Sequence, residues 1–281
     1  MMVPHEISIL VSSDPEAGAI NVSPDGSQFE IQLEDALRIP PEAVNVTIDV
    51  EEATVWWVVP NVITGQNDKM YITAPNVAGV LTPYVVTIPQ GLYDLSGINQ
   101  AIQRELQNLG AKIDPAPVLN LSPDDATQRV ELTLNYLGSQ VDFTPLDTPR
   151  EILGFDSKII GPTIIEPATV IADNTAAFNQ VNYFLIHSDL TNLGIRFNNQ
   201  YNQTITQVLI DVPPGSQIVS RPFNPARVNA PELGGASRTN LRFWLTDDKN
   251  RPVNTNGEFF TARVAIKYLL PHAILPTGSV V

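Results

Sequence analysis

Short runs in which apolar and polar residues alternate recur along almost the whole chain. Segment 29–33 reads FEIQL and segment 44–50 reads VNVTIDV. A period of two is typical of strands that bury one face. Turn residues (Pro, Gly, Asn and Asp) separate such runs at spacings of about 8 to 15 residues, which is the pattern of sandwiches and jelly rolls. We therefore predict an all-β protein.

Segment 55–59, VWWVV, is apolar at both parities, so we expect a strand covered on both faces and closed by Pro60. Similar patterns predict seven further strands, at residues 69–73, 84–88, 128–136, 180–187, 205–211, 240–246 and 258–269.

One amphipathic helix interrupts this pattern near residues 95–109. Its apolar residues recur at steps of three and four, Asp94 stands at the N-cap position and Gly110 follows the last turn. The apolar positions are Leu95, Ile98, Ile102, Leu106 and Leu109. A shorter helix is expected at 148–153, where Pro149 lies in the first turn. The long helix is expected to pack on a sheet, because no glycine-rich phosphate loop leads into it.

The length of 281 residues favours two folded units. VVTIPQG at 85–91 resembles VLIDVPPG at 208–215, and QRVELTLNYL at 128–137 resembles TARVAIKYLL at 261–270. The separations, roughly 120 and 130 residues, favour a duplicated β-unit joined near residues 156–174. We expect two consecutive eight-stranded jelly rolls, a double jelly roll, with a first unit at 1–160 that includes an N-terminal arm and a second at 161–281.

Charge and composition exclude several classes of function. The net charge is -14, with 16 basic against 30 acidic residues, so direct nucleic-acid binding is not expected. We expect neither a secretory signal nor a membrane-spanning segment, because the first residues lack the pattern of a signal peptide and no run of 18 apolar residues occurs. The chain contains no cysteine, so it has no disulfides. Charged residues make up 16%, against a typical ~25%, which suits a surface covered by copies of the same chain and equally an Asn-rich β-protein.

Known catalytic patterns are missing from the sequence. His187, Ser188 and Asp189 are the three residue types of a hydrolase triad. Consecutive strand residues point to opposite faces of the sheet, so these three cannot form a triad together. His5 and His272 lie near the termini, and neither is expected to be a ligand. We expect no catalytic residue, no organic cofactor and no enzymatic activity, since HExxH, GxSxG and Walker motifs are absent.

Two acidic pairs on turns are candidates for calcium. Asp124 and Asp125 form the first pair and Asp247 and Asp248 the second, where nearby asparagines offer further oxygen ligands. Neither pair has the spacing of an EF-hand, so solvated turn acids are the alternative. A shell protein of this negative charge would gain from divalent cations between subunits.

Several segments together resemble the double jelly-roll major capsid proteins of icosahedral viruses. They are IPQGLYDLSGINQAI with its helix, PREILGF, NYFLIHSDL, VPPGSQIVSRPFNP and LRFWLTDDKNRPVNTNGEFFTARVAIKYLL. The resemblance spans about residues 28–270 and points to the small end of that lineage, like the corticoviruses and other tailless bacteriophages with an internal membrane. It implies a structural virion protein that forms pseudo-hexagonal, pseudo-hexameric homotrimers tiling a shell. It also implies penton or other minor capsid proteins and an internal viral membrane as partners, and assembly in the host cytoplasm.

A second hypothesis is a two-domain β-sandwich that binds a carbohydrate or a receptor, or a virion spike. Stacking on sugars needs exposed aromatic residues. Trp56, Trp57 and Trp244 are the only tryptophans, and all lie in predicted strands. Either Trp56 or Trp57 must face away from the core, so the sequence permits one exposed tryptophan.

Overall fold

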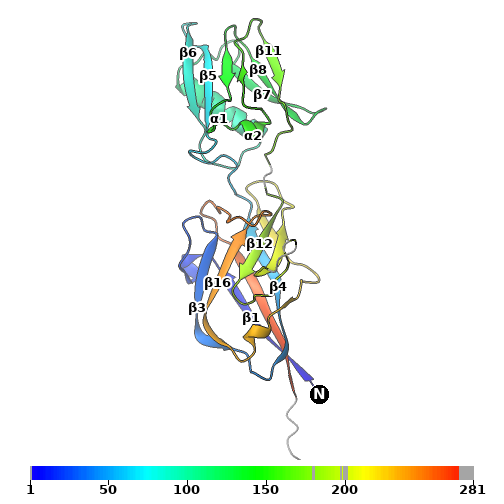
Figure 1. Cartoon of the computed structure of the whole chain (residues 1–281). Helices are drawn as coiled ribbons and strands as arrows, with labels where there is room; N and C mark the ends of the chain where they lie inside the picture. The colour runs from blue at the N-terminus through cyan, green and yellow to red at the C-terminus, as the bar shows by residue number, and fades with distance from the viewer. Residues whose placement is uncertain (1, 179–180, 197, 199–201, 272–281) are drawn as a thin grey trace, which may run out of the picture. The chain divides into compact units, whose positions relative to one another are not determined.

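The computed structural model describes residues 2–178, 181–196, 198 and 202–271. The chain divides into two compact units (Figure 1). Unit 1 combines Met1–Val58 with Val181–Val281, and unit 2 is Val59–Gln180. Unit 2 is therefore an insertion within the sequence of unit 1.

The described residues of unit 1 form eight strands of four or more residues, which we call its long strands. They are β1 (Met2–Ser12), β3 (Gln28–Arg38), β4 (Val44–Trp56), β12 (Tyr183–Ser188), β13 (Thr204–Leu209), β14 (Gln217–Ser220), β16 (Ser237–Thr246) and β17 (Thr261–Pro271). Shorter elements join them: β2 (Ala19–Ile20), β15 (Val228–Asn229) and the 3-10 helices η1 (Pro15–Ala17) and η2 (Pro231–Leu233).

These strands form two antiparallel sheets, with the orders β1-β17-β4-β14 and β13-β12-β16-β3-β2, and β15 pairs with β4. If the long strands are counted one to eight along the chain, the sheets have the orders 1-8-3-6 and 5-4-7-2. This is the connectivity of the eight-stranded jelly roll. Unit 2 is inserted between the third and fourth long strands, β4 and β12.

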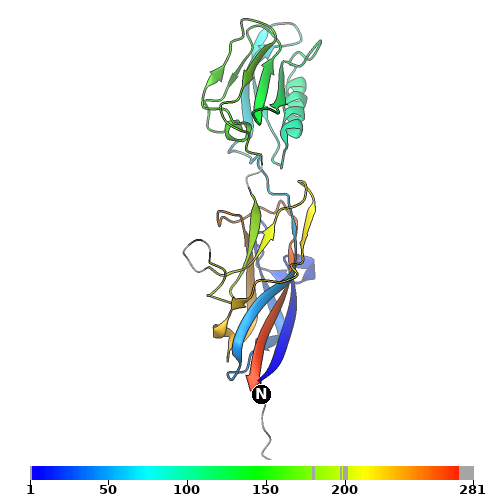
Figure 2. The ribbon, with the colours of Figure 1, turned by 90° about the vertical axis from the view of Figure 1, so that its right-hand side faces the viewer.

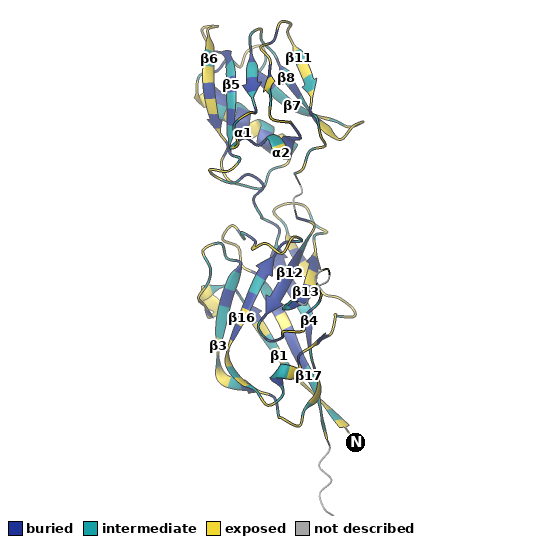
Figure 3. Ribbon diagram, in the orientation of Figure 1, coloured by how far each residue is buried: buried dark blue, intermediate teal, exposed yellow. Residues whose placement is uncertain are grey.

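The core of unit 1 lies between its two sheets, as the buried bands in Figure 3 show. Phe29 of β3 stacks on Phe243 of β16, with ring centroids 5.7 Å apart, and meets Phe260 edge-on at 5.3 Å. The first and last long strands close the roll, because β1 pairs with β17 along its whole length, from Met2 opposite Pro271 to Ser12 opposite Thr261.

Unit 2 is a sandwich of a four-stranded and a three-stranded antiparallel sheet, with the orders β10-β9-β5-β6 and β11-β8-β7. Its strands are β5 (Lys69–Pro75), β6 (Leu81–Thr87), β7 (Leu119–Asp124), β8 (Arg129–Leu134), β9 (Gln140–Asp142), β10 (Ile159–Ile160) and β11 (Ala168–Ile171). It also contains the helices α1 (Leu95–Asn108) and α2 (Arg150–Leu153).

Helix α1 follows β6 and precedes β7, and it contacts these two strands, which are the edge strands of different sheets. Its place beside the sandwich is visible in Figure 2. Asp94 caps it by accepting a hydrogen bond from the Gly97 amide at 2.6 Å. Ile98, Ile102 and Leu106 are buried. The helix therefore covers one open side of the sandwich, where unprotected strand edges would otherwise face water.

The all-β class, the jelly roll and the amphipathic helix are thus confirmed. Leu109 departs from the predicted stripe, because it follows the last helical turn and is 50% exposed. No helix among the described residues has the length and apolar character needed to span a membrane.

The predicted boundaries at 1–160 and 161–281 differ from the units of the structure. Residues 161–281 do not form a unit of their own, because β12 to β17 complete their sheets with β1, β3 and β4 from the first 58 residues. The expected connector at 156–174 instead holds β10 and β11, which pair with β9 and β8 inside unit 2. The described strands of unit 2 number seven and lack jelly-roll connectivity, so the two units are not matching rolls.

The expected N-terminal arm is also wrong, since residues 2–12 form β1 of the jelly roll. Both pairs of similar segments that suggested a duplication are divided between the units. QRVELTLNYL contains β8 of unit 2, whereas TARVAIKYLL lies in β17 of unit 1. VVTIPQG belongs to β6 and its following turn in unit 2, whereas VLIDVPPG belongs to β13 and its turn in unit 1. The similarity therefore reflects the common chemistry of a strand that ends in a proline turn.

Candidate functional site

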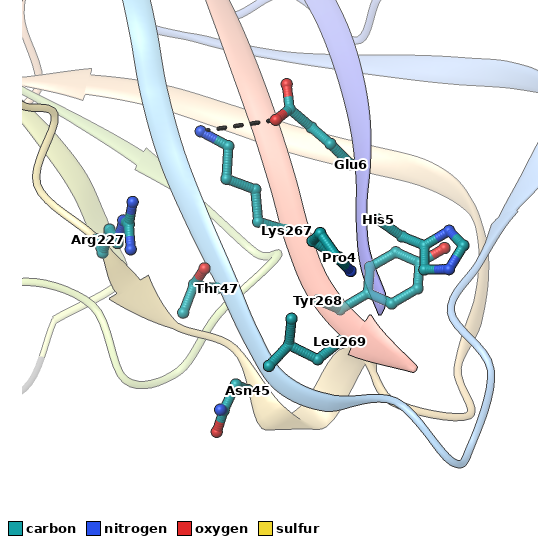
Figure 4. A pocket seen from close by; sticks show the side chains of 9 residues that line it. All are labelled: Pro4, His5, Glu6, Asn45, Thr47, Arg227, Lys267, Tyr268 and Leu269. Atoms are coloured by element: carbon teal, nitrogen blue, oxygen red, sulfur yellow. Dashed lines mark ion pairs between the residues drawn. The ribbon is translucent and has the colours of Figure 1, made fainter. Parts of the chain in front are cut away.

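A cleft of about 540 Å³ opens on the jelly roll where β1, β4 and β17 run side by side (Figure 4). Each strand contributes a short run of lining residues, and one arginine comes from the segment before β15. The lining residues are Pro4, His5, Glu6, Asn45, Thr47, Arg227, Lys267, Tyr268 and Leu269. Consecutive residues of β1 and of β17 point to opposite faces of the sheet, so the lining includes side chains from both faces.

Lys267 lies at the centre of the charged groups near this cleft. Its ammonium is 2.9 Å from the Asp49 carboxylate, 3.5 Å from Glu51 and 3.8 Å from Glu6. The hydrogen bond to Asp49 is the main reason that the pKa of Lys267 is raised above its usual value. The lysine therefore stays charged and ties β17 to both of its neighbours, β4 and β1.

Asp49 is a buried carboxylate on a strand that otherwise reads as ordinary alternation. It is 1% exposed, and Arg227 approaches its Oδ2 at 3.8 Å. Its other oxygen, Oδ1, is buried and has no hydrogen-bond partner among the described residues. A buried carboxylate depends strongly on its counter-ion, so the Asp49 and Lys267 pair fixes the register of β4 against β17.

His5 stacks on Tyr268 across β1 and β17, with ring centroids 5.4 Å apart. Its structural surroundings are thus those of a cross-strand aromatic pair. His272, the other terminal histidine considered in the sequence, lies outside the described residues.

The side chains of His187, Ser188 and Asp189 engage different partners. His187 is fully buried, and its ring nitrogens lie 2.7 Å from the Thr246 hydroxyl and 3.1 Å from the Thr204 hydroxyl. The Ser188 hydroxyl accepts a hydrogen bond from the Leu190 amide, and Asp189 accepts one from the Arg242 amide. The three residues therefore form no triad, as the strand alternation predicted.

The second calcium candidate, Asp247 with Asp248, lies in the turn after β16. Asp247 accepts hydrogen bonds from the amides of Lys249 and Arg251, and the Arg251 guanidinium pairs with it at 2.6 Å. Asp248 accepts a hydrogen bond from the Asn182 side chain at 2.6 Å. Both carboxylates thus shape this end of the jelly roll.

The first candidate, Asp124 with Asp125, belongs to unit 2 and borders a cleft of about 350 Å³. Asp124 accepts hydrogen bonds from the Ala126 amide and the Thr127 hydroxyl, as a turn aspartate does. Asp125 is exposed. Within the described part of the chain, no three His, Asp or Glu side chains are grouped so that they could hold a metal ion. Calcium therefore stays a prediction.

None of the three tryptophans is fully exposed. Trp57 is buried at 7% exposure, and Trp56 and Trp244 are intermediate. Trp244 stacks on His187. The adjacent pair therefore divides as alternation requires, with Trp57 as the inner member.

Large exposed apolar side chains gather on the loops of unit 2, a feature that the strand patterns did not reveal. Eight of them lie in or beside four loops, namely Val77, Val80, Leu81, Leu109, Ile113, Leu137, Ile164 and Ile165. The sequence signal was present in turn segments such as NVAGVL and GPTII, because loops seldom carry consecutive apolar residues without a reason.

No protein-family model and no curated protein sequence matches the chain. Among solved structures, the chain is similar to the crystal structure of the mavirus penton protein, with 12% identity, a TM-score of 0.46 and coverage of 95% of this chain and 100% of that one. It is also similar to a chain of the Sputnik virophage cryo-EM structure, with 12% identity, a TM-score of 0.36 and coverage of 94% and 97%. Both likenesses are too weak to assign the chain to a family.

Proposed function

We propose that the chain is a structural protein of an icosahedral virion shell and has no catalytic role. The observation that supports this most directly is the jelly-roll order of the long strands, 1-8-3-6 and 5-4-7-2, with a separate β-unit inserted between the third and fourth strands. Viral capsid proteins are one of the groups that use this architecture. Because jelly rolls also serve lectins and cupins, the topology motivates the proposal and an assembly measurement must test it.

The low charge content supports self-association as the basis of this role. Only 16% of residues are charged, although the net charge is -14. Copies with this net charge repel each other at long range, so stable contacts require patches that contain few charges. The exposed apolar residues of unit 2 provide such surface.

The difference between the two units bears on the proposed number of subunits per ring. A pseudo-hexagonal homotrimer needs two matching lobes per chain, and unit 1 and unit 2 differ in strand number and connectivity. A chain with one jelly roll supplies one such lobe, which suits the five-neighbour vertices of an icosahedral shell. We therefore propose a cyclic pentamer, with the homotrimer of the sequence analysis as the alternative.

The proposed position at the five-neighbour vertices implies two kinds of partner. A protein at five-neighbour vertices contacts further copies of itself and the coat protein that fills the six-neighbour positions. The internal membrane and assembly in the host cytoplasm remain predictions of the sequence resemblance. Calcium between subunits remains a prediction too, and adding a chelator during the mass measurement below tests it directly, since a bridging ion would be needed for full mass.

Light scattering coupled to size exclusion, run at low and moderate salt, tests the proposal. A ring of five has five times the chain mass of 30.7 kDa, or 153.5 kDa, and a trimer has 92.1 kDa. Contacts with few charges should persist at moderate salt, because screening weakens mainly charged contacts. A monomer at every concentration and salt would contradict the shell role. It would favour the receptor-binding or spike hypothesis, which a glycan array then examines.

A further inference from the structure

Four loops at one end of unit 2 carry exposed apolar side chains, and we call this surface the apolar end. It comprises the loops 75–81, 109–118, 135–139 and 161–167, with the eight exposed side chains named above. Asn61, near the start of unit 2, donates a hydrogen bond to the carbonyl of Phe178, near its last residue. The chain thus enters and leaves unit 2 at one place, and β5 leads from there to the apolar end (Figure 3).

Backbone hydrogen bonds join the four loops. The Val77 amide donates to the Gly110 carbonyl at 3.2 Å, and the Lys112 amide donates to Pro75 at 3.0 Å. On the other side, the Gly138 amide donates to Thr163 at 2.9 Å. The side chain of Leu81 lies against Gly138, where a Cβ would come within 2.7 Å of it. The exposed residues are therefore neighbours in space and not scattered positions.

The apolar end is preformed. Prolines 75, 115, 117, 162 and 167 limit the backbone freedom of three of the four loops. The Glu166 carboxylate accepts a hydrogen bond from the Leu137 amide at 3.1 Å, which ties the last two loops together. Binding a partner to such a surface costs little ordering entropy.

Few charges lie at the apolar end. The four loops contain only Lys112, Asp114 and Glu166 as charged residues. Lys112 lies over the ring of Tyr136, 4.5 Å from its centroid. Exposure of the apolar side chains ranges from 46% at Ile113 to 89% at Ile164. Eight such side chains give roughly 600 Å² of apolar surface, at the upper limit of patches on ordinary monomers.

The composition of the apolar end indicates which kind of partner binds there. A lipid surface is disfavoured, because membrane-binding elements are rich in Lys, Arg and aromatic residues, whereas these loops hold one lysine and two carboxylates. Two copies with a net charge of -14 can meet closely only through surfaces almost without charge. The patch also approaches the ~800 Å² that each partner of a stable complex buries.

From these observations we infer that the apolar end of unit 2 is a contact between copies of this chain, in which the apolar ends of two copies face each other, and Val80 and Ile164 are two of its exposed side chains. The inference deepens the proposed shell function, because it names one of the surfaces through which subunits associate. The contact can also be tested independently of the shell function, since copies can meet at the apolar end in an assembly of any size.

Single cysteines test the inference, because the natural chain has none. In the full-length protein, Ile164→Cys and Val80→Cys should form interchain disulfides under mild oxidation roughly ten-fold or more faster than control variants, owing to the raised local concentration. The controls are Val85→Cys, at a 51% exposed position within β6, and Leu209→Cys, at a 62% exposed position in unit 1. Cross-linking at the control rate would overturn the inference.

A second measurement keeps the two proposals apart. The variant Val80→Asp with Ile164→Asp should lower the mass of the assembly in light scattering, whereas Leu209→Asp should not. If the wild type assembles and the double variant keeps its full mass, the inference is wrong and the shell role stands. If the wild type is a monomer at light-scattering concentrations and Ile164→Cys still links rapidly in concentrated solution, the contact stands and the shell role is wrong.

Flotation of the wild type, but not of the double variant, with phosphatidylcholine vesicles would identify a lipid surface as the partner of the apolar end instead.

Discussion

The imidazole of His187 lies parallel to the indole of Trp244, with ring centroids 5.2 Å apart and 4° between the planes. The two residues are directly opposite each other on β12 and β16. With threonine hydroxyls at both ring nitrogens, the imidazole is enclosed on its face and at its edges. Such an environment accommodates a neutral ring far better than a charged one.

Stability should therefore depend on pH through His187. Burial lowers the pKa of His187 from 6.5 to about 4. The neutral ring contributes its full stability above pH 6.5, and this contribution is lost as the pH falls from 6.5 to 4, because in that range the unfolded chain is protonated and the folded chain is not. We expect a loss of about 2–3 kcal/mol between pH 7 and 4.5. Urea unfolding of the wild type and of His187→Gln measures it, and an unchanged pH slope in the variant would contradict the prediction.

Truncation of the buried stripe of α1 should destabilise unit 2. Ile102 is fully buried, so Ile102→Ala should cost about 2–5 kcal/mol of the free energy of unfolding. Gln107→Ala is the matched control on the exposed side of the same helix and should change stability by less than about 0.5 kcal/mol. Thermal unfolding compares the two, and equal small effects would show that the helix does not contribute to the core.

The ion pair between Lys267 and Asp49 should be strongly coupled. Lys267→Met leaves a carboxylate buried without its closest counter-ion, for an expected cost of about 3–5 kcal/mol. Adding Asp49→Asn should recover part of this loss, because the remaining amide needs no counter-ion. The exposed pair of Arg221 and Glu52 is the control, and Arg221→Ala should lower stability far less than Lys267→Met does, because solvent screens an exposed pair. Additive effects of the two core changes would refute the coupling.

The turn after β16 should depend on Asp247 as a hydrogen-bond acceptor. Asp247→Ala removes the acceptor of the Lys249 and Arg251 amides as well as the ion pair to Arg251, so we expect a loss of about 1–3 kcal/mol. Asp125→Ala, at an exposed turn position, should be almost neutral. Differential scanning calorimetry in calcium and in chelator measures both. A calcium-dependent rise in melting temperature that either substitution abolishes would assign the ion to that turn.

Local patterns were sufficient to predict both α-helices and nine of the described strands, whereas β1 and β7 were among the strands that they did not predict. Asp94, the apolar stripe and Gly110 marked α1 because caps and helical periodicity act within a few residues. The insertion was not visible in this way. A strand such as β4 alternates identically whether its partner follows at once or, like β17, begins at residue 261, so periodicity does not report connectivity.

The candidate site was predictable only in part. The alternation correctly separated His187, Ser188 and Asp189 and the two neighbouring tryptophans, since both cases depend on the period of a strand. Asp49, in contrast, occupies an apparently solvent-facing position of VNVTIDV. Its burial results from Lys267 and Arg227, which are more than 170 residues away in the sequence, so no local signal distinguishes it from an exposed aspartate.

The pairing of β1 with β17 also bears on how the protein forms during synthesis. The first long strand finds its partner only after residues 261–271 have left the ribosome, so the jelly roll cannot close while the chain is still growing. Unit 2, whose last strand ends at Ile171, has all its pairing partners about 90 residues earlier. The insert is thus able to fold first, and during its synthesis it separates strands β1 to β4 from the segments that complete their sheets.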